Sequence, residues 1–158
     1  MEKHVLYPGS FDPVTLGHLD ILERGAAIFD RITVVVAEYG KADLLDVDTR
    51  VRLFRESVTH LPNVRVEPFS GLLVDEVRQR GAMAVLRGIR NNTDYEHESA
   101  LAGVNALLDA EVEYLYLLAR PGMVSVSSTL VRDVIKHQGP LERLVPAPVI
   151  RFLSKAQG

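Results

Sequence analysis

Hydrophobic residues follow two different spacings along this chain. Short continuous apolar runs, typical of strands that are buried on both faces, occur at positions 5–7, 32–37, 64–66, 83–86 and 112–118. Between these runs, apolar residues recur every three or four positions, as they do on one face of a helix. Two such sets are Leu19, Leu22, Ala26 and Phe29, and Val51, Phe54 and Val58. The pattern predicts strands that alternate with helices.

Capping residues locate the ends of the predicted helices, because Ser, Thr, Asp and Asn favour the start of a helix and Gly its end. The expected starts lie near Gly17 and His18, after Asp46 or Asp48, at Asn92 or Thr93, and at Ser127 or Ser128. The expected ends are Gly81, Ala110 and Gly139. A last amphipathic segment spans 149–155.

Repeated strand–helix units predict a parallel sheet covered by helices on both faces. We therefore expect an α/β fold of the Rossmann-like, doubly wound type with five parallel strands, and residues 1–158 forming one domain. Ligands bind such sheets beyond the carboxyl ends of the strands, where the strand order reverses. The segments that follow the strands should therefore meet: 9–18, 38–41, 69–73, 87–90 and 120–129.

Composition narrows the classes of function. The chain has 158 residues, 47% of them hydrophobic, and a net charge of −3, so a general electrostatic affinity for nucleic acid is not expected. It has no cysteine, which excludes thiolate catalysis and thiolate metal sites. No apolar run approaches the roughly 18 residues of a membrane helix, and no secretion signal is evident. We expect a cytoplasmic protein without a membrane partner.

The turn after the first apolar run, residues 7–18 (YPGSFDPVTLGH), carries the most specific signal. A strand, a glycine turn and a helix in this order direct unpaired N–H groups and a positive helix end above the sheet. We predict phosphate there, with Gly9 allowing close approach and His18 presenting an N–H donor. The alternative is an ordinary cap at Thr15 followed by a helix-end histidine. Proline, hydroxyl and carboxyl groups are more densely grouped in this turn than a simple strand–helix connection requires, which favours the phosphate site.

Two arginines, Arg87 and Arg90, flank Gly88 at the end of the fourth predicted strand. Arginine suits bidentate contact with phosphate, and glycine permits close backbone approach. The alternative is that both arginines pair with nearby acids, which could be Asp94, Glu96 or Glu98. Lys41 by itself would be read as a solvated lysine. Its loop follows the second strand at the same edge of the sheet, which makes it a candidate anion ligand.

Three consecutive hydroxyl residues, Ser127, Ser128 and Thr129, open a predicted helix and precede Arg132. A single serine is sufficient as a cap, so the group predicts a second anion-binding helix start. Together the loops offer a histidine donor, cations and two helix starts, but neither a nucleophile with a paired base nor a dense carboxylate cluster. This inventory favours transfer of a phosphorus centre between reactants that bring their own nucleophile and leaving group.

Thr15-x-Gly17-His18 together with residues 127–132 (SSTLVR) resembles the signature pair of the nucleotidyltransferase superfamily, which includes class I aminoacyl-tRNA synthetases. Residues 7–13, 87–90 and 94–98 narrow the resemblance to the bacterial-type phosphopantetheine adenylyltransferase family. Agreement extends nearly end to end. It implies transfer of the adenylyl group of ATP to 4'-phosphopantetheine, giving dephospho-coenzyme A and pyrophosphate in coenzyme A biosynthesis.

The resemblance also implies roles for individual residues. His18 would stabilise the transition state. The ATP site would comprise Ser10, Phe11, His18, Gly88, Ile89, Arg90, Glu98, Met123, Val124, Ser125, Val126, Ser127, Ser128 and Thr129. The acceptor site would comprise Ser10, Lys41, Leu73 and Arg87. The family further implies Mg²⁺ held mainly through the ATP phosphates without protein metal ligands, feedback inhibition by coenzyme A, and a homohexamer.

Two other functions stay open at this point. One is a different small-acceptor nucleotidyltransferase, acting on nicotinamide mononucleotide, flavin mononucleotide or glycerol phosphate; the other is a non-catalytic nucleotide-sensing module. Arg87 with Lys41 and the apolar segment 69–73 favour a long pantetheine arm, and His18 favours catalysis because a pure binder needs no transition-state donor. The chain departs from the family at His97, often a tyrosine, at Met123, often aromatic, and in its 38–41 loop, one residue shorter than in many relatives.

Overall fold

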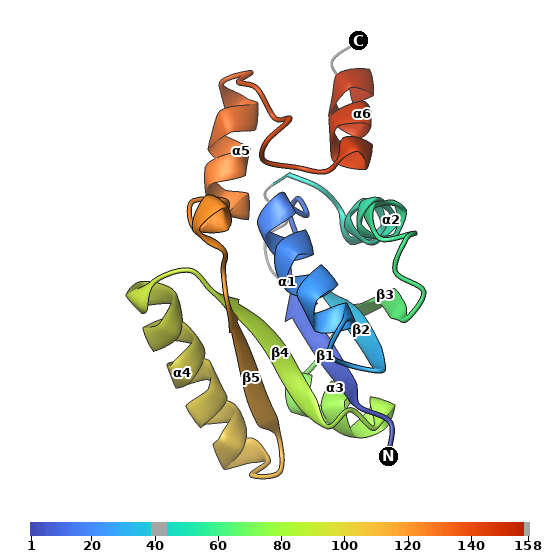
Figure 1. The fold of residues 1–158 in the computed structure, drawn as a ribbon, viewed down its shortest axis with the longest axis vertical. Coiled ribbons are helices and arrows are strands. Elements are labelled where there is room, and N and C mark those ends of the chain that lie inside the picture. The colour runs from blue at the N-terminus through green and yellow to red at the C-terminus, as the bar shows by residue number, and fades with distance from the viewer. Residues whose placement is uncertain (39–43, 157–158) are drawn as a thin grey trace.

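The computed structural model describes residues 1–38 and 44–156, and it places a five-stranded parallel sheet at the centre of the molecule (Figure 1). The strands are β1 (His4–Gly9), β2 (Arg31–Ala37), β3 (Val64–Phe69), β4 (Ala84–Ile89) and β5 (Glu113–Leu118). Their order is β3-β2-β1-β4-β5, and every neighbouring pair is parallel. The order therefore reverses between β1 and β4. This confirms the Rossmann-like α/β fold.

Helices cover both faces of this sheet (Figure 1). The helices of the described residues are α1 (Leu16–Ala26), α2 (Val47–Ser57), α3 (Leu73–Arg80), α4 (Asn92–Leu108), α5 (Ser128–Lys136) and α6 (Ala147–Ala156), with a 3-10 turn η1 (Pro121–Met123) before α5. Helices α5 and α6 lie beyond the carboxyl ends of the strands, where α6 contacts α2 (Figure 1). The side chains of four residues accept a backbone N–H in the first turn of their helices: Thr15, Asp46, Asn91 and Ser127. These caps agree with the starts predicted for α1, α2, α4 and α5.

The central strands supply side chains to two hydrophobic cores, one on each face of the sheet. Val5 and Tyr7 of β1 belong to the core that α1 and α2 complete, where Phe54 is fully buried. Leu6, between them, belongs to the opposite core, where Val77 of α3 packs. This alternation follows from the two-residue period of a strand. Burial on both faces explains why the strands read as continuous apolar runs.

Several bounds differ from the sequence-based expectation, among them β1, which continues to Gly9, and the three that follow. β4 continues to Ile89, so Arg87 lies within the strand rather than after it, because residues 84–89 pair in register with 113–118 of β5. β3 continues through Pro68 to Phe69, and proline is tolerated because β3 lies at the edge of the sheet. α1 ends at Ala26, so Phe29 lies beyond it, although its side chain still packs against the same core.

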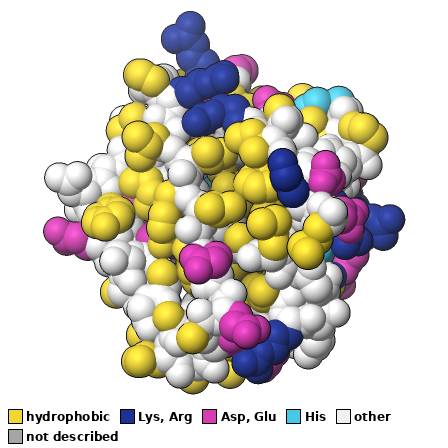
Figure 2. Space-filling view, turned by 60° about the horizontal axis from the view of Figure 1, so that its bottom comes forward, with side chains coloured by type: hydrophobic (Ala, Val, Ile, Leu, Met, Phe, Trp, Pro, Cys, Tyr) yellow, Lys and Arg dark blue, Asp and Glu magenta, His cyan; other side chains and the backbone are white. Residues whose placement is uncertain are grey.

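Helix α4 forms ion pairs and hydrogen bonds with β4, β5 and Arg90 but buries little of its own surface. Of its residues, all of which the structure describes, Glu98 is the one that is buried. Several apolar side chains of this helix are exposed instead: Leu101, Val104, Leu107 and Leu108. We call these four residues the α4 apolar face. Figure 2 shows hydrophobic side chains gathered across the side of the molecule that it presents.

Within the described residues, the structure contains no helix with the length and hydrophobicity needed to cross a membrane.

Candidate active site

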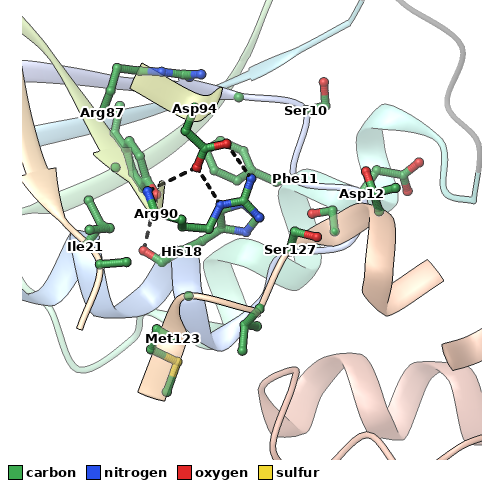
Figure 3. Close-up of a pocket in the computed structure, with 18 of the residues that line it drawn as sticks. Ser10, Phe11, Asp12, His18, Ile21, Arg87, Arg90, Asp94, Met123 and Ser127 are labelled. Atoms are coloured by element: carbon green, nitrogen blue, oxygen red, sulfur yellow. Dashed lines mark hydrogen bonds and ion pairs between the residues drawn. The ribbon is translucent and has the colours of Figure 1, made fainter. Parts of the chain in front are cut away.

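A cavity of about 360 Å³ lies at the carboxyl ends of β1 and β4, where the strand order reverses (Figure 3). Its walls come from the turn after β1, the first turns of α1 and α4, the end of β4, and the segment between β5 and α5. Its volume is within the range of small-molecule sites. The position agrees with the rule that ligands bind at such a reversal.

The structure brings most of the predicted site residues to this cavity. Those that line it are Ser10, Phe11, His18, Arg87, Gly88, Arg90, Glu98, Met123, Val126, Ser127, Ser128 and Thr129. Four predicted residues do not line it: Leu73, Ile89, Val124 and Ser125. Leu73 packs instead against the core under α3, and Ile89 is buried at the end of β4. Lys41 lies outside the described residues.

His18 is held by a reciprocal capping box at the start of α1. Thr15 Oγ1 accepts the backbone N–H of His18 at 3.2 Å, and the Nδ1 atom of His18 accepts the backbone N–H of Thr15 at 3.0 Å. Because Nδ1 accepts, the neutral imidazole carries its proton on Nε2. Burial, together with the charges of Arg90 and Arg87, lowers the pKa of His18 to about 3. His18 is therefore an uncharged N–H donor at neutral pH.

Phe11 fixes the turn that precedes this histidine. Its φ angle is 49°, in the left-handed region that a bulky residue rarely adopts, at a cost of about 1–3 kcal/mol. Its ring makes edge contacts with three other rings, those of Tyr7, His18 and Phe54, at centroid distances of 5.4, 4.9 and 4.7 Å. A Cβ atom on Gly9 would lie 2.7 Å from the Phe11 ring, so this packing requires glycine.

Both predicted phosphate-binding arginines are paired with acids of α4, and Figure 3 shows the pair of Arg90 and Asp94. Arg87 forms a bidentate ion pair with Glu98, with Nε 2.8 Å from Oε2, and its Nη1 donates to the carbonyl oxygen of Pro8. Arg90 forms a bidentate pair with Asp94 at 2.7 and 3.0 Å. The alternative based on ion pairs thus describes this structure correctly for Asp94 and Glu98, whereas Glu96 is exposed.

These pairs leave both guanidinium groups at the cavity rather than removing them from it. Arg87 uses one N–H on each of its three nitrogens, and a guanidinium carries five N–H donors in all. Burial favours a neutral Asp94, but the hydrogen bonds and charge of Arg90 outweigh it and lower the pKa of that carboxyl. Asp94 therefore stays charged at neutral pH, and the bidentate contacts of Asp94 and Glu98 orient the two guanidinium groups beside the cavity.

The start of α5 is joined to the turn after β1. Ser127 caps the helix, with Oγ 3.2 Å from the backbone nitrogen of Leu130. Ser128 Oγ donates to the carbonyl oxygen of Pro13 at 2.8 Å, and Arg132 Nη1 donates to that of Asp12 at 2.8 Å. The consecutive hydroxyls thus have separate tasks, and the helix start with its free N–H groups is brought to the cavity that His18 lines.

Comparison with known proteins agrees with this geometry. Residues 6–134 match the cytidylyltransferase-like family. The chain is 47% identical over 154 residues to the phosphopantetheine adenylyltransferase of Actinobacillus succinogenes, covering 97% of this chain and 96% of that protein. It is 46% identical over 149 residues to the enzyme of the same name from a Synechococcus strain, covering 94% of each. The chain belongs to the phosphopantetheine adenylyltransferase family.

Two residues differ from those common in the adenylyltransferase family, and one of them lines the cavity while the other does not. Met123 lines the cavity from the end of η1. His97 is exposed on α4 and does not line the cavity.

A buried arginine of this adenylyltransferase was missed by sequence reasoning. Arg50 of α2 is buried, and it donates to the backbone carbonyl oxygens of Leu45, Ser10 and Ala37 at 3.1, 2.6 and 3.0 Å. It therefore holds the Ser10 turn against the end of β2. The available signal was its place on the apolar stripe of α2, four residues before Phe54.

The acids around the cavity are engaged within the protein. Asp12 accepts the backbone N–H groups of Leu44 and Leu45 at 3.0 and 2.9 Å, while Asp94 and Glu98 hold the two arginines. Among residues 1–38 and 44–156, no three His, Asp or Glu side chains gather in a way that could hold a metal ion.

Proposed function

We propose that this protein transfers the adenylyl group of ATP to 4'-phosphopantetheine, giving dephospho-coenzyme A and pyrophosphate in coenzyme A biosynthesis. The observation that carries this proposal is the neutral N–H donor of His18, placed with Arg87 and Arg90 in one cavity at the switch point of the sheet. Relatives that are 46–47% identical over nearly the whole chain bear the name of this enzyme.

The chemistry needs no general base, since the acceptor phosphate is an anion and a nucleophile at neutral pH. One of its oxygens forms a bond to the α-phosphorus of ATP, while the bond from that phosphorus to the bridging oxygen breaks. The electron pair of the broken bond leaves with pyrophosphate. The Nε2–H of His18 would donate to an α-phosphate oxygen, whose charge rises in the transition state.

The two ends of the cavity would serve the two substrates. ATP would lie against Arg90 and the start of α5, with Ser10, Phe11, Gly88, Ile89, Glu98 and the segment 123–129 around it. Arg87, with Ser10 and Lys41, would hold the acceptor phosphate. Leu73, which stands outside the cavity on α3, would contact the far part of the pantetheine arm.

Magnesium would be held mainly through the ATP phosphates, because the acids at the cavity already hold protein partners. When bound, the ion neutralises phosphate charge and helps to orient the leaving group.

Coenzyme A carries both the adenylyl and the pantetheine parts of the product, so we propose that it competes for this cavity as a feedback inhibitor. We also propose that the protein works in the cytoplasm, where ATP and Mg²⁺ are abundant.

The test is release of pyrophosphate from ATP with a panel of acceptors. We expect turnover with 4'-phosphopantetheine and little or none with nicotinamide mononucleotide, flavin mononucleotide or glycerol phosphate. Chelation of divalent ions with EDTA should abolish turnover, and excess Mg²⁺ should restore it. Binding of ATP without turnover with any acceptor would instead support a nucleotide sensor, and preference for another acceptor would reassign the substrate.

We further propose that the protein forms a homohexamer in part through the α4 apolar face. Leu107 is 88% exposed and Leu101, Val104 and Leu108 are exposed beside it at helical spacing. Contiguous exposed apolar side chains of this kind mark association surfaces. A second copy of the chain is the partner that a homohexamer requires at this face.

Replacing Leu107 with glutamate is expected to reduce the molar mass in solution, because a charge at an apolar contact opposes association. Size-exclusion chromatography with light scattering measures this directly. Ile28, also exposed but outside α4, provides a matched control, and Ile28→Glu should leave the mass unchanged. An equal mass for Leu107→Glu and the wild type would refute the role of this face.

A further inference from the structure

One face of α1 contacts the segment between β5 and α5 along its length. Gly17, Asp20 and Arg24 share this face because they are spaced by three and four residues. A Cβ atom on Gly17 would lie 2.8 Å from the carbonyl oxygen of Val126, so helix and segment touch backbone to backbone. His18, which precedes Asp20 by two residues, belongs to the same helix.

Asp20 forms the centre of a small ionic cluster on this face. Its carboxylate is largely buried and accepts a hydrogen bond from Arg24 Nη1 at 3.0 Å. The same nitrogen donates to the carbonyl oxygen of Leu118, the last residue of β5, at 2.8 Å. The other carboxylate oxygen of Asp20 lies 3.4 Å from Nε of Arg120. The cluster thus binds the segment at two points, its backbone at 118 and its side chain at 120.

The segment held in this way forms one wall of the cavity. Ala119 and Met123 line the cavity. The backbone N–H of Met123 donates to the carbonyl oxygen of Arg120 at 2.8 Å, which closes a tight turn between these two lining residues. The backbone N–H of Ala119 donates to the carbonyl oxygen of Ile89 at 2.8 Å. The wall is therefore fixed to β4 on one side and to α1 on the other.

We propose that Asp20 and Arg24 are positioning residues for the nucleotide. They set the distance between the wall formed by residues 118–126 and the helix that carries His18. This inference rests on the proposed function, since it takes ATP as the molecule against that wall. His18 keeps its own contacts with Thr15 and Phe11, which do not involve the cluster. Loss of the cluster should therefore weaken nucleotide binding more than it slows the chemical step.

The test uses steady-state kinetics of the full chain with ATP and 4'-phosphopantetheine varied separately. Arg24→Gln should raise the KM for ATP about five- to tenfold, the size expected when a charged donor to a buried acceptor is lost. The kcat and the KM for the acceptor should change by less than about twofold. Arg24→Lys keeps a charged donor and should recover most of the loss. Arg120→Gln, at an exposed residue, should shift the KM for ATP in the same direction by less.

Arg80→Gln provides a matched control. Arg80 forms an i,i+4 ion pair with Glu76 on α3, with side chains 25% and 13% exposed, against 27% and 9% for Arg24 and Asp20. Neither residue of this pair lines the cavity. Arg80 also pairs with Glu67, so Arg80→Gln loses two side-chain contacts, as Arg24→Gln loses its contacts with Asp20 and with the carbonyl oxygen of Leu118. A purely structural effect would lower the thermal stability of both variants and leave the KM for ATP unchanged.

The outcomes separate this inference from the proposed function. Turnover of the wild type with unchanged KM for ATP in Arg24→Gln and Arg120→Gln overturns the positioning role alone. Equal losses for both substrates, or equal losses in Arg24→Gln and Arg80→Gln, also overturn it. An inactive wild type overturns the proposed function. If Arg24→Gln does not fold, the KM for ATP in Arg120→Gln and in Arg24→Lys provides the same test of the positioning role.

Discussion

Replacing His18 with alanine is expected to lower kcat about 100- to 1,000-fold, the usual loss when one donor to a transition-state oxyanion is removed. The KM for either substrate should change little, because the donor meets a charge that forms mainly in the transition state. Initial rates of pyrophosphate release under saturating conditions measure the effect. Near-normal turnover in the variant would contradict the role of His18.

A control and a pH profile sharpen this result. His60, exposed and paired with Glu23 on the surface, should be replaceable by alanine without loss of rate. The pKa of His18 is lowered to about 3, so the uncharged ring persists throughout the range from about pH 5 to 8. Ionisation of His18 should therefore cause no change of the wild-type kcat/KM with pH in that range. A pH dependence that is present in the wild type and absent in His18→Ala would show instead that the ring titrates there.

The second large effect is expected at the two arginines, and it differs between them. Arg87→Ala should weaken binding of 4'-phosphopantetheine about 10- to 100-fold, and Arg90→Ala should do the same for ATP, since each loses charged hydrogen bonds to phosphate. The assignment is the one that the family resemblance implies, for Arg87 within β4, whose side chain contacts Pro8 of β1, and for Arg90 directly after β4. Calorimetric titration of each ligand into each variant measures the effect.

Stability must be followed in the same variants. Arg87→Ala leaves the buried carboxylate of Glu98 without its arginine, and breaking such a pair typically costs about 3–5 kcal/mol. Thermal unfolding therefore shows whether the binding data refer to folded protein. Arg78→Ala serves as the control, because it also removes the arginine partner of a buried carboxylate, that of Asp109, but lies away from the cavity. It should leave the binding of both ligands unchanged. Equal weakening of both ligands in both cavity variants would refute the division of labour.

The fold could be predicted from local patterns because its parallel strands are buried on both faces. The run at 32–37 is almost wholly apolar for this reason, and it became β2. Thr15, Asp46 and Ser127 were recognisable because capping is a contact within a few residues. The end of β4 was misplaced because its last residues are fixed by pairing with β5, which lies about 30 positions further on and leaves no local pattern.

Residues of the candidate site could be predicted where they belong to a short sequence motif. They could not be predicted where their role depends on contacts with backbone atoms distant in the sequence. His18 and the arginines at 87 and 90 stood in recognisable patterns. Arg24 and Arg50 did not, because the carbonyl oxygens that they contact lie up to 94 positions away. The same limit applies to the ion pairs of Arg87 and Arg90. The sequence suggested acidic partners, but only the packing of α4 selects Asp94 and Glu98 over Glu96.

Phe11 belongs to the hydrophobic core and to the wall of the cavity at once, through its contacts with Phe54 and with His18. Most cores tolerate gradual exchange of one apolar residue for another over evolution. Here, a smaller side chain at position 54 would free the ring that braces the imidazole. A substitution in the interior beneath α2 is therefore expected to change the position of the His18 ring as well as the stability of the fold.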